Sequence, residues 1–364
     1  MRKDILFILH FTPPIHGSSI VGEQIRDSKL LSESFDGHFV NLNTSEQMNE
    51  IGQIGITKLF KYYNILWKVF ISLLLHKPKI CYIAITAKGL AFYKDAIIVL
   101  LVKLFGVKTI FHMHNKGVST RQDRFIDNIL YKLVFNNSEV IILSKYLYPD
   151  IKKYVSLSRL HLCFNGVKDF DQKNYKIPNQ VVEILFLSNL IESKGVYILL
   201  EACKLLKKNG ISFQCKFVGG EGDVSEDQFK SKIKNMNLQN CVDYVGKKYG
   251  RDKEELFYNA DIFAFPTYYH NECFPLVLLE AMQFSLPIVS TFEGGISDII
   301  EDSKTGFLVN QQDVQALANK LEELIINYKL RTKMGIAGRK LFDEKFTISH
   351  FERRMHEILN SVIT

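Results

Sequence analysis

The sequence predicts an α/β protein with two doubly wound domains that face each other across a cleft. Short, near-continuous apolar runs, typical of parallel strands buried on both faces, alternate with longer amphipathic stretches typical of helices. The alternation stops at the polar segment 167–180, which carries Pro178, and then starts again. Two such arrays imply two domains, and 364 residues are enough to give each domain a core.

Nine segments are expected to form the strands. In the first domain, placed at residues 1–170, they are 4–10, 79–85, 108–114 and 139–143. In the second domain, placed at residues 180–345, they are 183–190, 213–220, 241–246, 261–266 and 286–290. Ligands of doubly wound sheets bind outside the carboxyl ends of the strands, so the side chains that follow these segments are the candidates for a site.

The composition is that of an ordinary globular protein, with 47% hydrophobic and 23% charged residues. The most apolar stretches, Val69–Leu75 and Ala96–Val102, are too short to cross a bilayer. The start, MRKDILFILHFTPP, has no small-residue cleavage site and is interpreted as a buried strand, which predicts a cytoplasmic protein. The six cysteines have no metal-finger spacing and are expected to be reduced core residues.

The net charge of +7 is concentrated in the first half of the chain. Residues 1–180 hold 24 Lys and Arg against 14 Asp and Glu, whereas residues 181–364 hold 22 against 25. A basic domain favours nucleic acid, an anionic membrane surface or a phosphate-bearing substrate, although a lysine surplus without function gives the same count. The sequence contains no known nucleic-acid-binding module, so no nucleic-acid partner is expected.

Two strand-to-helix turns carry groups that suit phosphate. After the first strand, Gly17 allows a tight turn, and Ser18 and Ser19 are natural N-caps for the next helix. In the second domain, Lys194 and Gly195 stand at a helix start, where a cation beside free amides suits a diphosphate. The dinucleotide fingerprint and the P-loop lysine pattern are absent, which argues against a nicotinamide enzyme and an ordinary NTPase.

The strongest local signal is ADIFAFPTYYHNECFPLVLLEAM, in which a buried strand leads through a polar loop to a helix from about Pro275. Glu272 precedes this helix and Glu280 follows eight positions later, so both carboxylates can point to one side. Glu280 has apolar neighbours, among which a carboxylate is unfavourable unless it has partners, and ribose hydroxyl groups are suitable partners. Gly294 and Gly295 then allow close backbone approach before another helix.

The pair Glu272 and Glu280 resembles the E-x7-E signature of the family-4 retaining glycosyltransferases, which have the GT-B fold of two Rossmann-like domains. The surrounding motifs agree in order and spacing: HGSS, FHMH, Asn165-Gly166-Val167, Lys194-Gly195, VGGEGD, ADIFAFP, GG and TGFLV. The resemblance covers nearly the whole chain. It implies a nucleotide-sugar donor held mainly by the second domain, and we expect a helix at about 346–364 to pack back on the first.

The resemblance also implies roles for residues of the second domain. Glu280 would bind the ribose hydroxyl groups, Glu272 would face the donor sugar as a catalytic residue, and Lys194 would neutralise the diphosphate. The segment that would meet sugar or phosphate comprises Cys273, Phe274, Pro275 and Leu276. Members of the family usually carry an arginine shortly before the lysine, whereas Ser188 and Asn189 stand there in this chain. Either Asn189 donates a hydrogen bond instead, or the activity is weaker than is typical.

In the first domain, the resemblance implies that Gly17 and Ser18 approach the diphosphate and that His114 sits beside the transferring sugar as a second catalytic residue. His112 shares a strand face with His114, and one of the two is expected to be structural. His16 is interpreted as a loop residue, with a role in acceptor binding as the alternative.

No cofactor is expected besides the nucleotide-sugar, which is a co-substrate, and no metal. The residues Asp169-Phe170-Asp171 spell D-x-D, a metal–nucleotide pattern of other glycosyltransferases. They lie in the linker rather than after a buried strand, so metal binding is not expected there.

The segment 57–78 combines lysines with a broad apolar face. On a helical wheel, Lys58, Lys61 and Lys68 share a narrow stripe that includes Ile65, and the rest is apolar and aromatic. An interfacial helix on an anionic membrane has this pattern, and so does a core helix packed on a sheet.

Together these features predict a retaining transferase that moves a sugar from a nucleotide-sugar, with a UDP-sugar favoured on frequency alone. The acceptor would be a glycan or a lipid-diphosphate-linked saccharide, as in cell-surface polysaccharide biosynthesis at the inner face of the membrane. No nucleophile is evident, so we expect front-face displacement that relies on positioning and electrostatic stabilisation. The alternatives are a nucleotide-sugar-binding partner subunit without activity, and a sugar-nucleotide epimerase or glycan phosphorylase on the same fold.

Overall fold

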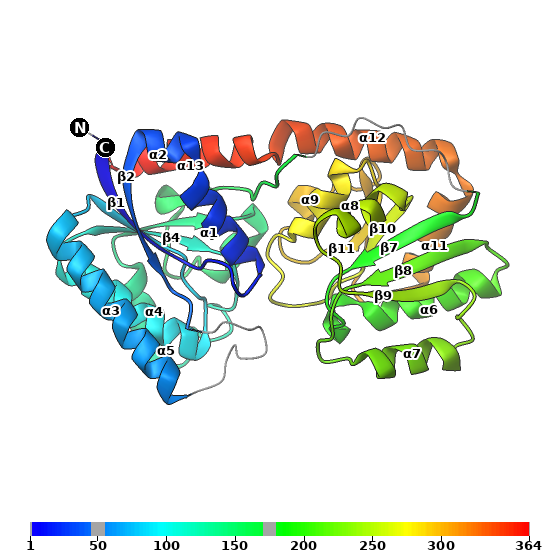
Figure 1. The fold of residues 1–364 in the computed structure, drawn as a ribbon, viewed down its shortest axis with the longest axis horizontal. Helices are drawn as coiled ribbons and strands as arrows, with labels where there is room; N and C mark the ends of the chain where they lie inside the picture. Colours follow the sequence, from blue (N-terminus) through cyan, green and yellow to red (C-terminus); the bar gives the residue numbers. More distant parts are fainter. Residues whose placement is uncertain (1, 45–54, 170–179, 364) are drawn as a thin grey trace. The chain divides into compact units, whose positions relative to one another are not determined.

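The computed structural model describes residues 2–44, 55–169 and 180–363, and the chain divides into two compact units. The N-terminal unit comprises residues 1–165 and 348–364, and the C-terminal unit comprises residues 166–347. Each unit is built on a six-stranded parallel sheet with helices on both faces (Figure 1).

The sheet of the N-terminal unit has the strand order β2-β1-β3-β4-β5-β6. Its strands are β1 (Lys3–Leu9), β2 (Phe35–Asn41), β3 (Ile80–Ile83), β4 (Lys108–Met113), β5 (Ser138–Ile142) and β6 (Leu160–Leu162). Its α-helices are α1 (Gly17–Asp27), α2 (Lys29–Ser34), α3 (Ile56–His76), α4 (Gly89–Leu104), α5 (Phe125–Phe135) and α13 (Ile348–Ile363). Helices α1, α2 and α13 cover one face of the sheet, and α3, α4 and α5 cover the other (Figure 1).

The end of the chain completes the N-terminal unit. Phe351, Met355 and Leu359 recur every four residues along α13 and are fully buried. They belong to the same apolar cluster as Ile5 and Phe7 of β1. The helix therefore buries one stripe against the sheet on which the chain began, as the period of an amphipathic helix requires.

The sheet of the C-terminal unit has the order β12-β11-β10-β7-β8-β9. Its strands are β7 (Val182–Leu187), β8 (Phe213–Val218), β9 (Val242–Gly246), β10 (Ile262–Phe265), β11 (Ile288–Thr291) and β12 (Gly306–Val309). Its α-helices are α6 (Val196–Lys208), α7 (Glu226–Asn235), α8 (Gly250–Asn259), α9 (Leu276–Gln283), α10 (Ile296–Ile299), α11 (Val314–Ile326) and α12 (Tyr328–Lys345). The order reverses beside β7, because β8 lies on one side of it and β10 on the other.

Three strands, β2, β6 and β12, lie outside the nine segments that the sequence predicts. All three stand at the edge of a sheet. An edge strand has a partner strand on one side only, and only Phe35 and Val40 of β2 are buried, while β6 has no buried side chain. The continuous apolar run that marks a central strand is therefore missing from both.

Helix α3 packs on the sheet by one face and exposes another. Tyr62, Ile65 and Val69 are buried, whereas Phe60 and Trp67 on the opposite side are 71% and 61% exposed. Ile65, the apolar member of the predicted lysine stripe, points into the core, whereas Lys61 and Lys68 of the same stripe are exposed. Among the described residues no helix is long and apolar enough to cross a membrane.

Candidate active site

Two loops meet where the strand order of the C-terminal sheet reverses. The loop after β7 leads through a 3-10 turn at Glu192–Lys194 to α6, and the loop after β10 leads to α9. The Tyr268 N–H donates to the Ser193 carbonyl at 2.8 Å, and the Thr267 hydroxyl donates to the same carbonyl at 3.3 Å. A reversal of strand order is the place where doubly wound sheets bind their ligands.

Two glycines permit this close approach. Gly195 has φ +91°, and a Cβ atom on it would stand 2.2 Å from the Pro266 carbonyl oxygen. Gly294 has φ +53°, and its Cβ would stand 2.2 Å from the carbonyl oxygen of Glu272. Any side chain at either position would push the loops apart.

Lys194 and Glu272 form an ion pair across these loops. The lysine ammonium donates to Glu272 Oε2, and the side chains are only 15% and 9% exposed. The Lys194 Nζ also lies 4.6 Å from the ring centroid of Tyr269, within cation–π range. A buried carboxylate needs such a cation, so the pair holds one positive and one negative group at the switch point.

Glu280 has a protein partner that its sequence neighbours do not reveal. Lys253 Nζ of α8 lies 2.7 Å from Glu280 Oε1, and the two side chains are 26% and 21% exposed. No cation stands close to Glu280 in the sequence, and α8 supplies Lys253 from 27 positions upstream. Glu280 remains partly accessible, so its second oxygen can still meet a ligand.

The N-terminus of α9 lies between the two glutamates in sequence. The helix begins at Leu276 with Pro275 as its N-cap, and proline has no polar side chain with which to cap it. No acidic residue stands in the first turn, so the positive end of the helix dipole is not neutralised there. The carbonyl of Cys273 accepts the Gly295 N–H at 2.6 Å, which fixes the segment against the loop after β11.

Ser188 and Asn189, which stand where the family carries an arginine, are both tied to neighbouring backbone groups. The Ser188 N–H donates to the Val218 carbonyl at 2.9 Å, and Asn189 Oδ1 accepts the Gly220 N–H at 3.2 Å. An exposed lysine that the sequence analysis missed, Lys247 after β9, lies across Gly220. A Cβ atom on Gly220 would stand 1.9 Å from Lys247 Cε. Only the adjacency of β8 and β9 brings this cation beside Gly220, whose N–H donates to Asn189.

In the N-terminal unit, Gly17 and Ser18 form the first turn of α1, but Ser18 does not cap it. His16 is the N-cap, and its Nδ1 accepts the Ser19 N–H at 3.2 Å while the Ser19 hydroxyl accepts the His16 N–H at 3.0 Å. The predicted serine cap at Ser18 is therefore corrected, whereas His16 lies in the loop before the helix, as predicted, and caps it. Gly17 has open space around its Cα.

Four histidines gather beside the carboxyl ends of β1 and β4. The rings of His112 and His114 lie 4.1 Å apart, and those of His10 and His16 lie 5.6 Å apart. His112 is fully buried, and its Nδ1 shares a hydrogen bond with the Tyr82 hydroxyl. Burial lowers the pKa of His114 to about 3 and that of His16 to about 4, so both rings are neutral at physiological pH.

This cluster predicts that the protein loses stability in mild acid. The unfolded histidines bind protons below about pH 6.5, whereas the folded ones do not, so the free energy of unfolding falls as the pH drops from 6.5 toward 4. Asp95 opposes this, because burial raises its carboxyl pKa to about 6. We expect a net loss of at least about 1 kcal/mol per pH unit. Urea titrations followed by circular dichroism at pH 7.5, 6.5 and 5.5 measure it, and His114→Asn should flatten the slope. An equally steep slope in that variant would contradict the assignment.

Asp169, the first carboxylate of the D-x-D pattern, binds other side chains of the C-terminal unit. Both Asp169 oxygens lie 3.0 Å from one Arg339 nitrogen, and Gln283 Nε2 donates to the same carboxylate. Asp171 lies outside the described residues. Within residues 2–44, 55–169 and 180–363, no cluster of three His, Cys, Asp or Glu side chains could hold a metal ion.

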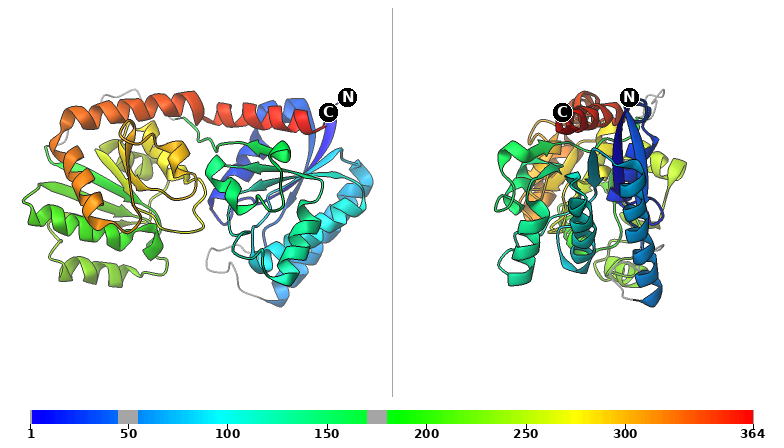
Figure 2. Two further views of the ribbon diagram at one scale, coloured as in Figure 1. Left: turned by 180° about the vertical axis from the view of Figure 1, so that it is seen from behind. Right: turned by 90° about the vertical axis from the view of Figure 1, so that its left-hand side faces the viewer.

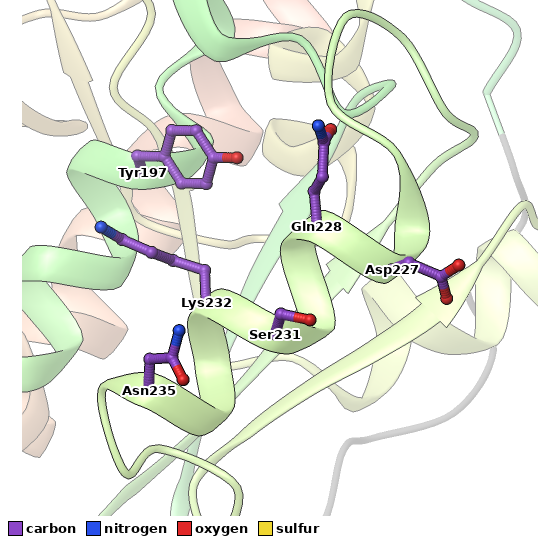
Figure 3. Close-up of a pocket in the computed structure, with 6 residues that line it drawn as sticks. All are labelled: Tyr197, Asp227, Gln228, Ser231, Lys232 and Asn235. Atoms are coloured by element: carbon purple, nitrogen blue, oxygen red, sulfur yellow. The ribbon is translucent and has the colours of Figure 1, made fainter.

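A shallow hollow of about 380 Å³ opens elsewhere in the C-terminal unit, between α6 and α7. Figure 3 shows Tyr197 of α6 beside Lys232 of α7, whose Nζ lies 5.8 Å from the ring centroid. Its lining contains none of the predicted site residues and only one carboxylate, Asp227. The charged pair at the switch point is therefore the candidate active site.

Two parallel six-stranded sheets, the second with a charged pair at its switch point, define the architecture of a GT-B glycosyltransferase. Residues 167–341 match the family model described as "Glycosyl transferases group 1". The greater part of the C-terminal unit, which carries Lys194, Glu272 and Glu280, therefore resembles this family.

Relatives and solved structures agree with this assignment. The amylovoran biosynthesis glycosyltransferase AmsK of Erwinia amylovora is 34% identical over 194 residues, which are 52% of this chain and 47% of AmsK. The capsular polysaccharide biosynthesis glycosyltransferase CapM of Staphylococcus aureus is 26% identical over 53% of this chain and 50% of CapM. The chain thus spans about half the length of these relatives. The fold of Anabaena HepE, solved in complex with UDP, superimposes with a TM-score of 0.75 at 17% identity over 99% of this chain and all of HepE.

Proposed function

We propose that this protein is a retaining glycosyltransferase that moves a sugar from a UDP-sugar to a glycan or lipid-diphosphate-linked acceptor in polysaccharide biosynthesis. The observation that carries the proposal is the Lys194–Glu272 pair at the switch point, beside the N-terminus of α9. The names of AmsK and CapM, both polysaccharide biosynthesis glycosyltransferases, support the substrate class.

The donor's diphosphate would bind at Lys194 and at the amide groups of the Cys273–Leu276 segment. Lys247 would add a second cation near Asn189, where the family usually has arginine. Glu280 would accept hydrogen bonds from the ribose hydroxyl groups through the oxygen that does not face Lys253. Glu272 would accept them from the donor sugar. Each group is charged or dipolar and is already fixed by its neighbours, so binding requires little reorganisation.

The reaction would break the bond between the anomeric carbon and the β-phosphate oxygen and form a bond to the acceptor oxygen on the same face of the sugar. The proton of the acceptor hydroxyl would pass to the departing diphosphate. Lys194 would stabilise the charge that grows on that diphosphate. His114 is neutral at physiological pH, so its role beside the sugar would be that of a hydrogen-bonding group and not of a cation.

The acceptor side belongs to the N-terminal half of the chain in this proposal. Residues 1–180 carry the whole positive surplus of the protein, which suits a phosphate-bearing acceptor. We place the reaction at the cytoplasmic face of the membrane, where a lipid-diphosphate-linked saccharide would present its sugar to the protein.

Donor binding and product analysis test this function together. Thermal melting with UDP-, GDP- and ADP-sugars should single out one base, since a ligand at 100 times its Kd stabilises the folded protein by about 2.7 kcal/mol. Release of the nucleoside diphosphate that depends on an acceptor distinguishes a transferase from a binding subunit. The anomeric configuration of the product, read by NMR, distinguishes retention from inversion. Binding without any turnover of donor would overturn the proposal.

We expect transfer to proceed without a divalent metal. Lys194 and the N-terminus of α9 would take the charge role that Mg²⁺ has in other enzymes of this kind. Turnover should change less than about twofold in excess EDTA, a small effect compared with the loss of a required charge-stabilising group. If EDTA abolishes turnover and Mg²⁺ or Mn²⁺ restores it, Asp171 becomes a candidate metal ligand.

A further inference from the structure

Three neighbouring helices of the N-terminal unit expose large apolar side chains on the side that faces away from the sheet. Helices α3, α4 and α5 lie side by side over one sheet face (Figure 1 and Figure 2). Their outward side chains include Phe60, Trp67, Ile97, Leu104, Ile126 and Leu133, which we call the three-helix face. Leu104 is 83% exposed and Ile126 is 64% exposed. A contiguous apolar surface of this kind marks an interaction site.

The exposed residues recur with helical spacing, so they form one surface and not scattered exceptions. Leu90, Ile97 and Leu104 are seven residues apart on α4, and Ile126, Ile129 and Leu133 follow one another by three and four on α5. Each of these helices buries its opposite stripe against the sheet. Helix α4 contacts both of its neighbours: the Phe70 ring of α3 lies 5.8 Å from that of Phe105 at the end of α4, and the Phe92 ring of α4 lies 4.5 Å from that of Tyr131 of α5.

The charges on the three helices have one sign. Their lysines are Lys58, Lys61, Lys68, Lys94, Lys103 and Lys132. Their two carboxylates are both buried and occupied: Asp95 accepts the Thr86 N–H at 2.8 Å, and Asp127 accepts from Arg121 at 2.9 Å. Of these lysines, Lys61, Lys68 and Lys132 are exposed, whereas both carboxylates of the three helices are buried. By contrast, α7 of the other unit begins with Glu226 and Asp227 before its lysines.

We propose that the three-helix face docks on an anionic lipid bilayer. Apolar side chains would enter the interface while the lysines at their margins meet lipid phosphate groups. A protein partner fits the pattern less well, because lysine is depleted from protein interfaces, whereas helices that lie on membranes carry lysines together with Trp, Phe and Leu. The proposal extends the membrane location that belongs to the proposed function. It rests on the proposed function in one respect, since a lipid-linked acceptor would lie in the same bilayer.

The protein contains its own probe for this surface. Trp67 is the single tryptophan of the chain and lies on the three-helix face. Its fluorescence should shift to the blue when the protein meets vesicles of phosphatidylcholine and phosphatidylglycerol, and brominated lipids should quench it. High salt should reverse most of the effect, because it screens the lysine–lipid attraction. Pure phosphatidylcholine vesicles should give a much smaller shift.

Matched variants separate the apolar and the charged contributions. We expect Ile97→Ser/Leu104→Ser and Lys61→Glu/Lys68→Glu each to reduce vesicle binding at least about tenfold, since each changed lysine alone contributes on the order of a severalfold effect. The control Ile326→Ser/Ile336→Ser changes two residues of the C-terminal unit that are 68% and 62% exposed, and it should bind vesicles as the parent does. Circular dichroism melting checks that all three variants fold.

Equal binding to neutral and anionic vesicles, or equal loss in the control, would overturn the proposal. The absence of vesicle binding would also overturn it. If the protein then dimerises with rising concentration, and Ile97→Ser/Leu104→Ser abolishes this dimerisation, the three-helix face is a contact between copies of the chain. UDP binding is measured on the same samples. If UDP binding fails while vesicle binding persists, the proposed function falls and the docking surface stands; the opposite result removes only the surface.

Discussion

Replacing Glu280 with alanine should weaken binding of the donor nucleotide about 100-fold, the largest effect on affinity that we expect from a single substitution. A carboxylate that accepts hydrogen bonds from two ribose hydroxyl groups contributes about 1.5–3 kcal/mol for each bond, and alanine removes both bonds. Isothermal titration with UDP and with the UDP-sugar measures the loss. Unchanged affinity would eliminate the ribose role.

The ion pair with Lys253 supplies the control for this experiment. Lys253→Ala breaks the same 2.7 Å contact but leaves the Glu280 carboxylate in place. Both variants should lose a similar amount of stability, about 1 kcal/mol or less for a pair that is roughly one quarter exposed. Donor affinity should fall only in Glu280→Ala. Equal losses of affinity in the two variants would mean that Glu280 serves the packing of α8 on α9 and does not contact the donor.

Replacing Lys194 with alanine should lower turnover about 100- to 1000-fold, the largest catalytic effect that we expect. The cation opposes the charge that develops on the departing diphosphate, and removing one such group from a preorganised site has effects of this size. Ser18→Ala should lower turnover less than about fivefold, because alanine retains the backbone amide at this helix start. Steady-state release of UDP measures both. Similar losses in the two variants would contradict the assigned roles.

Lys194→Ala also leaves Glu272 buried without its cation. We expect this to lower the free energy of unfolding by about 3 kcal/mol. The double variant Lys194→Ala/Glu272→Gln removes that buried charge and should recover the melting temperature without recovering turnover. Recovery of turnover would show that Lys194 acts only by holding Glu272.

In a further variant, Asn189→Arg should maintain or raise turnover if this position faces the diphosphate, since Lys247 already approaches the neighbouring Gly220 from β9.

Local sequence patterns were sufficient for the central strands and for the order of the motifs. A strand buried on both faces is a continuous apolar run, and the strand–loop–helix around Glu272 and Glu280 is written in adjacent residues. The same signal fails at β2 and β6, because an edge strand is solvated along one side and its sequence resembles a loop. These two edge strands can therefore be identified only from their pairing with a neighbouring strand in the sheet.

The sequence by itself determined the class of fold and indicated the E-x7-E pair as a candidate site, because these depend on periods and spacings within about 30 residues. Tertiary structure decided which charges meet. Lys194 joins Glu272 from 78 positions away because the strand order reverses between β7 and β10, and Lys253 joins Glu280 because α8 packs beside α9. It also decided which side of α3 is buried: a helical wheel shows that lysines and aromatic residues separate, but only the sheet beneath the helix determines which side faces solvent.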